Sequence, residues 1–143
     1  MGFKDVFAPK ISNSKMENVK KLLKDANDCA SLSNTTVLPD VFFTKYDELE
    51  RDLSELVKYE KYKIFKGTRP STNLKNVKEN RKNDENAFIQ RSYSLARKNA
   101  EAADSEEKRA EIFKSYFDSI DKYRDRMDSF NIQVLNDLKK LSL

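Results

Sequence analysis

The chain has only two glycines, Gly2 and Gly67, and three prolines, Pro9, Pro39 and Pro70, among its 143 residues. Sheet proteins place such residues at nearly every hairpin, because tight turns need their backbone conformations. A chain with so few of them is restricted to a small number of long helices joined by a few breaks. The sequence therefore predicts an all-α protein.

Apolar residues recur every three or four positions over residues 16–30 and again over residues 42–64, which indicates two helices that each bury one face. The segment Ser14–Glu17 matches a capping box at the start of the first helix. Pro39 suits the first turn of the second helix, which we expect to run to about Phe65.

A third helix is expected over residues 70–103, and Ser105 begins a fourth helix that reaches residue 141. The fourth helix carries two sets of apolar residues that recur every seven positions, a pattern typical of a coiled coil or a long bundle helix. These heptad residues are Phe113, Ile120, Met127, Val134 and Leu141, together with Tyr116, Tyr123 and Phe130. A bend at Asp128–Ser129, giving two shorter helices, is the alternative.

These helices predict an elongated four-helix bundle that forms a single domain over residues 1–143, with residues 1–13 as a loosely packed lead. The third and fourth helices are expected to form a long antiparallel hairpin. The tyrosines of the heptads could also be interpreted as a stacking platform for bases, but their register favours a core or an interface. The apolar seam therefore predicts a non-enzymatic module for protein–protein interaction or self-assembly, and a homo-oligomer.

Residue types that support catalysis are scarce. The chain has no histidine, which excludes the imidazole-dependent triads and removes the commonest metal ligand. Its single cysteine, Cys29, can form neither an intrachain disulfide nor a multi-cysteine metal site, and we expect it to be a small buried residue. Two isolated glycines cannot build a phosphate-binding loop. We therefore expect no enzyme, no cofactor and no metal.

Four aspartates stand at helical spacing in the fourth helix and could in principle hold Ca²⁺ or Mg²⁺. They are Asp118, Asp121, Asp125 and Asp128. They lie opposite the apolar seam, and Lys114 and Lys122 each stand four residues from Asp118, which favours surface ion pairs. A solvated acidic face is the better interpretation. A carboxylate-dependent enzyme is the third hypothesis, after protein–protein interaction and nucleic-acid binding.

A basic segment over residues 58–82 carries nine lysines and arginines against two glutamates. The cations are Lys58, Lys61, Lys63, Lys66, Arg69, Lys75, Lys78, Arg81 and Lys82. They could neutralise phosphates while Tyr59, Tyr62 or Phe65 stacks on bases, which makes nucleic-acid binding the second hypothesis. In the alternative, the aromatic rings turn inward and the lysines complement the end of a helix dipole.

Residues 1–10 lack the apolar core of a signal peptide, and Val6 stands where N-myristoylation requires serine or threonine. No apolar run approaches the roughly 18 residues of a membrane span. We therefore expect a cytoplasmic protein with no membrane partner.

A pattern of apolar and turn residues extends over residues 20–95. Its segments are Asp28–Ala30, Asn34–Thr36, Pro39–Phe43, Tyr46–Asp47 and Lys58–Tyr62, followed by Phe65, Gly67 and Pro70. In this pattern the chain resembles a group of short helical proteins from low-GC Gram-positive bacteria and their mobile elements, which have no assigned activity. The resemblance implies a bacterial cytosolic protein and carries over no functional site.

Overall fold

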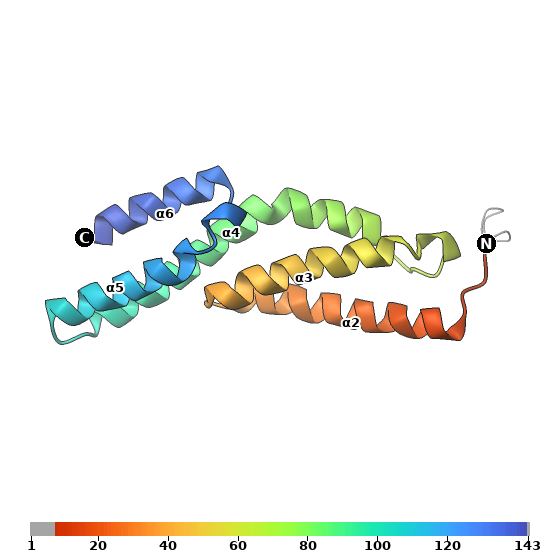
Figure 1. Ribbon diagram of the computed structural model, residues 1–143, viewed down its shortest axis with the longest axis horizontal. Coiled ribbons are helices and arrows are strands. Elements are labelled where there is room, and N and C mark those ends of the chain that lie inside the picture. Colours follow the sequence, from red (N-terminus) through yellow and green to blue (C-terminus); the bar gives the residue numbers. More distant parts are fainter. Residues whose placement is uncertain (1–7, 143) are drawn as a thin grey trace. The chain divides into compact units, whose positions relative to one another are not determined.

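The computed structural model describes residues 8–142, which form five α-helices and two short 3₁₀ turns (Figure 1). The α-helices are α2 (Asn13–Thr35), α3 (Pro39–Val57), α4 (Pro70–Glu101), α5 (Glu106–Asp121) and α6 (Ser129–Ser142), and the turns are η1 (Glu60–Tyr62) and η2 (Arg124–Arg126). This part of the chain contains no strand, so the predicted all-α class is confirmed. None of its helices has the length and apolar character to cross a lipid bilayer.

Helix starts follow local capping chemistry. Ser105 Oγ accepts a hydrogen bond from the backbone N–H three residues later at 3.2 Å, and α5 begins there as predicted. α3 begins at Pro39, also as predicted. At α2 the prediction of Ser14 as the capping residue is wrong, because Ser12 Oγ accepts from the Lys15 N–H at 3.3 Å and the helix begins at Asn13.

The end of α3 differs from the prediction. The helix stops at Val57, well before Phe65, and η1 follows it. At Lys63 the backbone adopts a left-handed conformation, with φ of 57°, and the Lys63 N–H donates to the Glu60 carbonyl. Gly67, with φ of 81°, provides a second left-handed position before α4.

Two tyrosine hydroxyls hold η1 against α2. Asn18 Nδ2 donates to the Tyr59 hydroxyl at 2.9 Å, and Lys15 Nζ donates to the Tyr62 hydroxyl at 3.0 Å. These bonds join residues more than 40 positions apart, so the spacing of apolar residues in the sequence cannot predict them. They stabilise a turn where the local pattern alone predicts a continuing helix.

Two helices occupy the region where one helix over residues 105–141 was predicted. α5 ends at Asp121, η2 follows, and Met127 is extended (φ −94°, ψ 147°) before α6 begins at Ser129. The predicted single helix is therefore wrong. The alternative of two shorter helices is confirmed, with a break over residues 122–128.

Glu85 of α4 explains the position of this break. Its side chain is 1% exposed, and its Oε2 accepts hydrogen bonds from the Asp128 N–H at 3.0 Å and from Asn131 Nδ2 at 3.2 Å. Asn131 Nδ2 also donates to the Lys82 carbonyl at 2.8 Å, and Arg81 Nε donates to Glu85 Oε1 at 2.9 Å. In an uninterrupted helix the Asp128 N–H would bond within the helix and could not reach Glu85.

The described residues gather into two compact units. Unit 1 contains residues 8–32 and 45–79, and unit 2 contains residues 33–44 and 80–142. The single domain and the elongated four-helix arrangement stay predictions.

In unit 1, α2 and α3 lie side by side (Figure 1) and bury an apolar core between them. The core residues recur at helical spacing on both helices and are Val19, Ala26, Cys29, Leu49, Leu53 and Leu56. Ile11 packs against this core, so the predicted lead is anchored at that residue, and residues 1–7 lie outside the described part of the chain. Tyr46 donates to the Val77 carbonyl at 2.6 Å, which ties α4 to α3.

In unit 2, the first turn of α3 supplies aromatic side chains to the core. The Phe42 ring stacks on Phe88 of α4 with centroids 4.5 Å apart, and Phe43 stacks on Tyr123 at 4.6 Å. Arg91 fixes the preceding loop, because its guanidinium donates to the Thr36 carbonyl at 2.7 Å and to a second carbonyl nearby at 2.8 Å.

The C-terminal part of α4 and α5 lie side by side in unit 2 (Figure 1). The Ser92 and Tyr116 hydroxyls are 2.8 Å apart, and the Tyr93 and Phe113 rings stack with centroids 6.1 Å apart. α6 packs on α5 through its own buried face, on which Leu135 is 1% exposed.

Candidate functional site

The predicted heptad seam is divided by the break between α5 and α6. Tyr116, Ile120 and Met127 are buried, whereas Phe113, Tyr123 and Val134 are half-buried, and Phe130 and Leu141 are 48% and 80% exposed. α6 is a separate helix that begins at Ser129. Its buried residues are Asn131 and Leu135, not the predicted heptad residues. The eight residues therefore do not form one continuous stripe.

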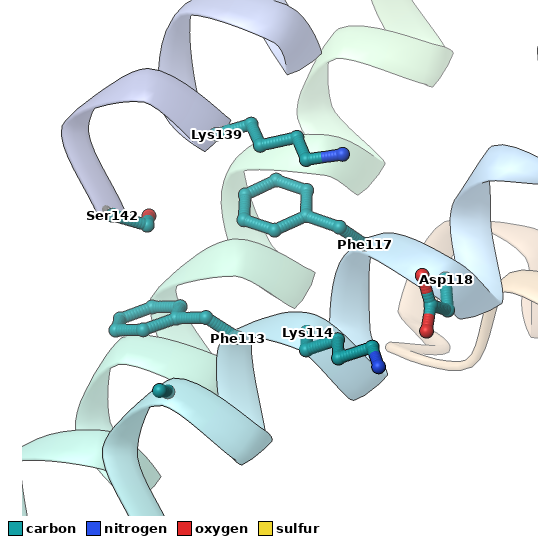
Figure 2. A pocket seen from close by; sticks show the side chains of 7 residues that line it. Phe113, Lys114, Phe117, Asp118, Lys139 and Ser142 are labelled. Carbon is teal, nitrogen blue, oxygen red and sulfur yellow. The ribbon is translucent and has the colours of Figure 1, made fainter. Parts of the chain in front are cut away.

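A groove opens between α5 and α6 in unit 2, with a volume of about 400 Å³ (Figure 2). The Phe113 and Phe117 rings of α5 line it, and Lys139 and Ser142 of α6 lie across from them (Figure 2). Phe117 is 5% exposed and belongs to the core, whereas Phe113 is only half-buried. The groove therefore presents an apolar floor of the kind that accepts another side chain or a helix.

Charges of both signs surround this apolar floor. Lys114 and Asp118 of α5 and Lys139 of α6 contribute to its lining (Figure 2). All three side chains are exposed. The rim can therefore pair with a surface that carries both signs.

The basic segment is divided between the two units. Lys58 to Lys78 belong to unit 1, and Arg81 and Lys82 belong to unit 2. Several of the cations have partners within the chain: Lys58 pairs with Glu55 at 2.9 Å, Lys75 with Glu79 at 3.9 Å, Arg81 with Glu85 at 2.9 Å, and Lys82 lies over the Phe130 ring at 4.3 Å. Lys61 also lies over the Tyr62 ring at 5.3 Å, although its side chain is exposed. Lys63, Lys66, Arg69 and Lys78 are exposed as well.

The aromatic residues of the basic segment contact the rest of unit 1: Tyr59 and Phe65 pack against its core, and Tyr62 bonds to α2. Tyr59, Tyr62 and Phe65 are half-buried, and the two hydroxyls accept hydrogen bonds from α2. The Lys15 ammonium at the Tyr62 hydroxyl lowers the pKa of that tyrosine. The geometry agrees with the alternative in which the rings turn inward.

The four aspartates considered as a cation site do not share a helix face. Asp118 lines the α5–α6 groove, Asp121 pairs with Arg124, Asp125 lies in η2, and Asp128 Oδ1 accepts from the Phe130 N–H at 2.8 Å at the start of α6. The predicted pairing of Lys122 with Asp118 is also wrong, because Lys122 Nζ lies 3.2 Å from Asp40. The break after Asp121 moves the later aspartates out of register.

A cluster of ionisable groups that sequence reasoning missed lies between α2 and α3 in unit 1. α2 contributes Asp25 and Cys29, and α3 contributes Lys45, Glu48 and Asp52. One ligand atom from each of Asp25, Cys29 and Glu48 lies within 4.8 Å of the other two, so these three side chains could hold a metal ion. The Cys29 thiol donates to Asp25 Oδ2 at 3.7 Å, and Lys45 Nζ lies 3.1 Å from Glu48 Oε2. We call these five residues the acidic cluster.

Burial and mutual repulsion shift the titrations in the acidic cluster. Burial raises the pKa of Asp52 to about 7, and the neighbouring Asp25 and Glu48 carboxyl groups raise it in the same direction. Hydrogen bonding to Asp52 lowers the pKa of Asp25. Burial, reinforced by the charge of Asp25, raises the pKa of the Cys29 thiol to about 12, so Cys29 is not an activated nucleophile.

Comparison with models of protein families, with curated proteins and with solved structures finds no match for this chain.

Proposed function

We propose that the chain is a non-enzymatic, cytoplasmic interaction protein that self-associates through the α5–α6 groove. The observation that carries this proposal is the groove itself, an apolar floor formed by Phe113 and Phe117 that no part of residues 8–142 fills. A bacterial origin, implied by the resemblance of residues 20–95, belongs to the same proposal.

Two features favour a second copy of this chain as the occupant. α6 carries one wall of the groove and also Leu141, whose side chain is 80% exposed. In a two-fold symmetric pair, Leu141 of each copy can enter the groove of the other, because an isologous interface repeats each contact. The rim supplies Lys114 and Asp118, so each charge can meet its opposite across the axis.

The oligomeric state of the full chain, measured by sedimentation equilibrium at several protein concentrations, tests the proposal. We expect a monomer–dimer equilibrium that Leu141→Lys weakens about tenfold or more, since burying a leucine contributes about 1.5–3 kcal/mol. Leu23→Lys is the matched control, because Leu23 is 39% exposed on α2 in unit 1. A monomer at every concentration, or equal weakening by both substitutions, contradicts the proposal.

A second candidate function, nucleic-acid binding, is favoured by the five exposed cations of the basic segment. The side chains of Lys61, Lys63, Lys66, Arg69 and Lys78 are exposed to solvent. Fluorescence anisotropy with labelled DNA and RNA at about 50 and 200 mM salt tests it, because phosphate contacts lose orders of magnitude in affinity over that range. Binding must weaken when Lys61, Lys63, Lys66 and Arg69 are replaced by alanine, and salt-independent binding counts against this candidate.

A further inference from the structure

The acidic cluster is built from two side-chain pairs at helical spacing on facing helices. Asp25 and Cys29 stand four residues apart on α2, and Glu48 and Asp52 stand four residues apart on α3. Residues four apart project from one helix face, so each helix directs two ligand-type side chains toward the other. Metal sites in helical bundles are built in this way, from side chains on facing helices.

A buried oxygen of Asp52, beside the three ligand-type side chains, is an independent observation that points to a ligand. The Asp52 side chain is 7% exposed, and its Oδ2 is completely buried with no hydrogen-bond partner in the described part of the chain. The carboxyl group faces Asp25, which carries charge of the same sign. A buried carboxylate oxygen without a donor is costly unless a proton or a cation satisfies it.

The charges in the cluster do not balance. Asp25, Glu48 and Asp52 supply three carboxyl groups, and Lys45 supplies one ammonium, which is directed to Glu48. The positive charge of Arg51 attracts the Asp52 carboxylate, but the Arg51 side chain is exposed to solvent. The carboxyl groups of the acidic cluster therefore outnumber its ammonium group by two.

We propose that the acidic cluster is a binding site for a divalent cation of the zinc class, with Asp25, Cys29 and Glu48 as ligands and Asp52 as the carboxylate beside them. Zinc accepts thiolate sulfur at about 2.3 Å and carboxylate oxygen at about 2.0–2.2 Å, so tetrahedral ligand atoms lie roughly 3.3–3.8 Å apart. The three ligand atoms lie within 4.8 Å of one another, and Cys29 Sγ and Asp25 Oδ2 are already 3.7 Å apart.

The thiol of Cys29 determines which cation the site prefers. Calcium and magnesium prefer oxygen ligands only, whereas thiolate ligands select zinc and related softer ions. On binding, the Cys29 S–H bond breaks, the sulfur keeps the electron pair and coordinates the ion, and the proton passes to solvent. The ion does not change its oxidation state.

Titration of the full-length protein with Co²⁺, followed by absorption spectroscopy, tests this assignment, and competition of Zn²⁺ with a chromophoric chelator gives the affinity. We expect a thiolate-to-cobalt charge-transfer band that Zn²⁺ displaces. Cys29→Ser should abolish the band, and Asp52→Asn should weaken Zn²⁺ binding about tenfold or more. Asp28→Asn, at an exposed position on the same helix, is the matched control and should change neither.

Lys45→Gln is expected to change the Zn²⁺ affinity in the opposite direction. Removing the ammonium should strengthen Zn²⁺ binding about tenfold, because it removes the repulsion of a neighbouring positive charge. This variant is not expected to disturb folding, since Lys45 is partly exposed. The helical circular dichroism of each variant is recorded alongside the titration.

The proposal is overturned if the wild-type protein gives no thiolate band with Co²⁺ and no competition for Zn²⁺. It is equally overturned if binding persists in folded Cys29→Ser and Asp52→Asn variants. In either case the acidic cluster is not a metal-binding site. The acidic cluster lies in unit 1 and the groove lies in unit 2, so this outcome is independent of the self-association test.

Discussion

Replacement of Glu85 by alanine should destabilise the protein severely, because this carboxylate connects α4 to the start of α6. Its two oxygens accept from Arg81 Nε at 2.9 Å, from the Asp128 N–H at 3.0 Å and from Asn131 Nδ2 at 3.2 Å. Asn131 is 0% exposed, so its amide cannot turn to water when Glu85 is removed. Glu85→Ala therefore leaves a buried donor with a lost partner as well as a cavity.

The magnitude follows from the burial of the carboxylate. Breaking a buried ion pair by removing one partner costs about 3–5 kcal/mol, and the upper half of that range is expected here because two further hydrogen bonds are lost. The total free energy of unfolding of a protein this size is about 5–15 kcal/mol. Glu85→Ala should therefore lower the melting temperature by about 13–17 °C. Glu85→Gln keeps the shape of the side chain and should lose less.

Urea unfolding followed by circular dichroism measures the change, and hydrogen exchange locates it. We expect amides of α6 (residues 129–142) to exchange faster than those of α2 in the variant. Glu101→Ala is the matched control, since the Arg97–Glu101 pair has the same spacing but is 66% and 68% exposed, and it should cost less than about 1 kcal/mol. A loss below about 1 kcal/mol for Glu85→Ala, or unchanged exchange in α6, would refute the reasoning.

Three further substitutions test the packing and titration described above. Phe42→Ala removes the ring stacked on Phe88 and should cost about 3–5 kcal/mol in urea unfolding, and a loss below about 1 kcal/mol would mean that the ring is not core. Tyr116→Phe removes the hydroxyl shared with Ser92 and should cost about 1 kcal/mol at neutral pH. Burial raises the pKa of Tyr116 to about 12, so its contribution is present below the unfolded value of 10.0 and is lost as the pH rises toward 12. Between pH 10 and pH 12 the free energy of unfolding should therefore fall less in Tyr116→Phe than in the wild type. An equal fall in both proteins would contradict this. Ser105→Ala removes the cap of α5 and should lower the melting temperature by an amount equivalent to about 1 kcal/mol, whereas an unchanged value would show that the cap is dispensable.

Local chemistry predicted where α3 and α5 begin, although not the cap of α2, and it did not predict where α3 and α5 end. Ser105 and Pro39 act on the first turn that follows them, so their effect is visible in the sequence. The end of α3 depends instead on the Tyr59 and Tyr62 hydroxyls, whose partners lie on another helix. The break after α5 depends on Glu85, which precedes Asp128 by 43 residues. Polar contacts between residues far apart in the chain produce no periodic pattern in the sequence.

The acidic cluster was missed for a related reason. On α2 alone, Asp25 and Cys29 are a charged residue beside a small buried one, and on α3 alone, Glu48 and Asp52 are two acidic residues on a helix. Only the pairing of the two helices brings them together. Facing i, i+4 pairs of ligand-type residues on consecutive amphipathic helices would have been the sequence signal. The heptad pattern led to the opposite error, a predicted feature that the structure lacks. Its seven-residue period continues through residues 122–128, which do not form an α-helix.

The arrangement of unit 2 from two separated stretches has a consequence for synthesis of the chain. Residues 33–44, with the Phe42 and Phe43 rings, leave the ribosome long before the residues that cover them. Arg91 follows its partner Thr36 by 55 residues, which takes about 3–11 s at ordinary elongation rates. Throughout that interval two adjacent phenylalanines are exposed on a nascent chain whose unit 1 residues are being completed. The apolar surface of this segment is therefore covered only after Phe88 has been synthesised.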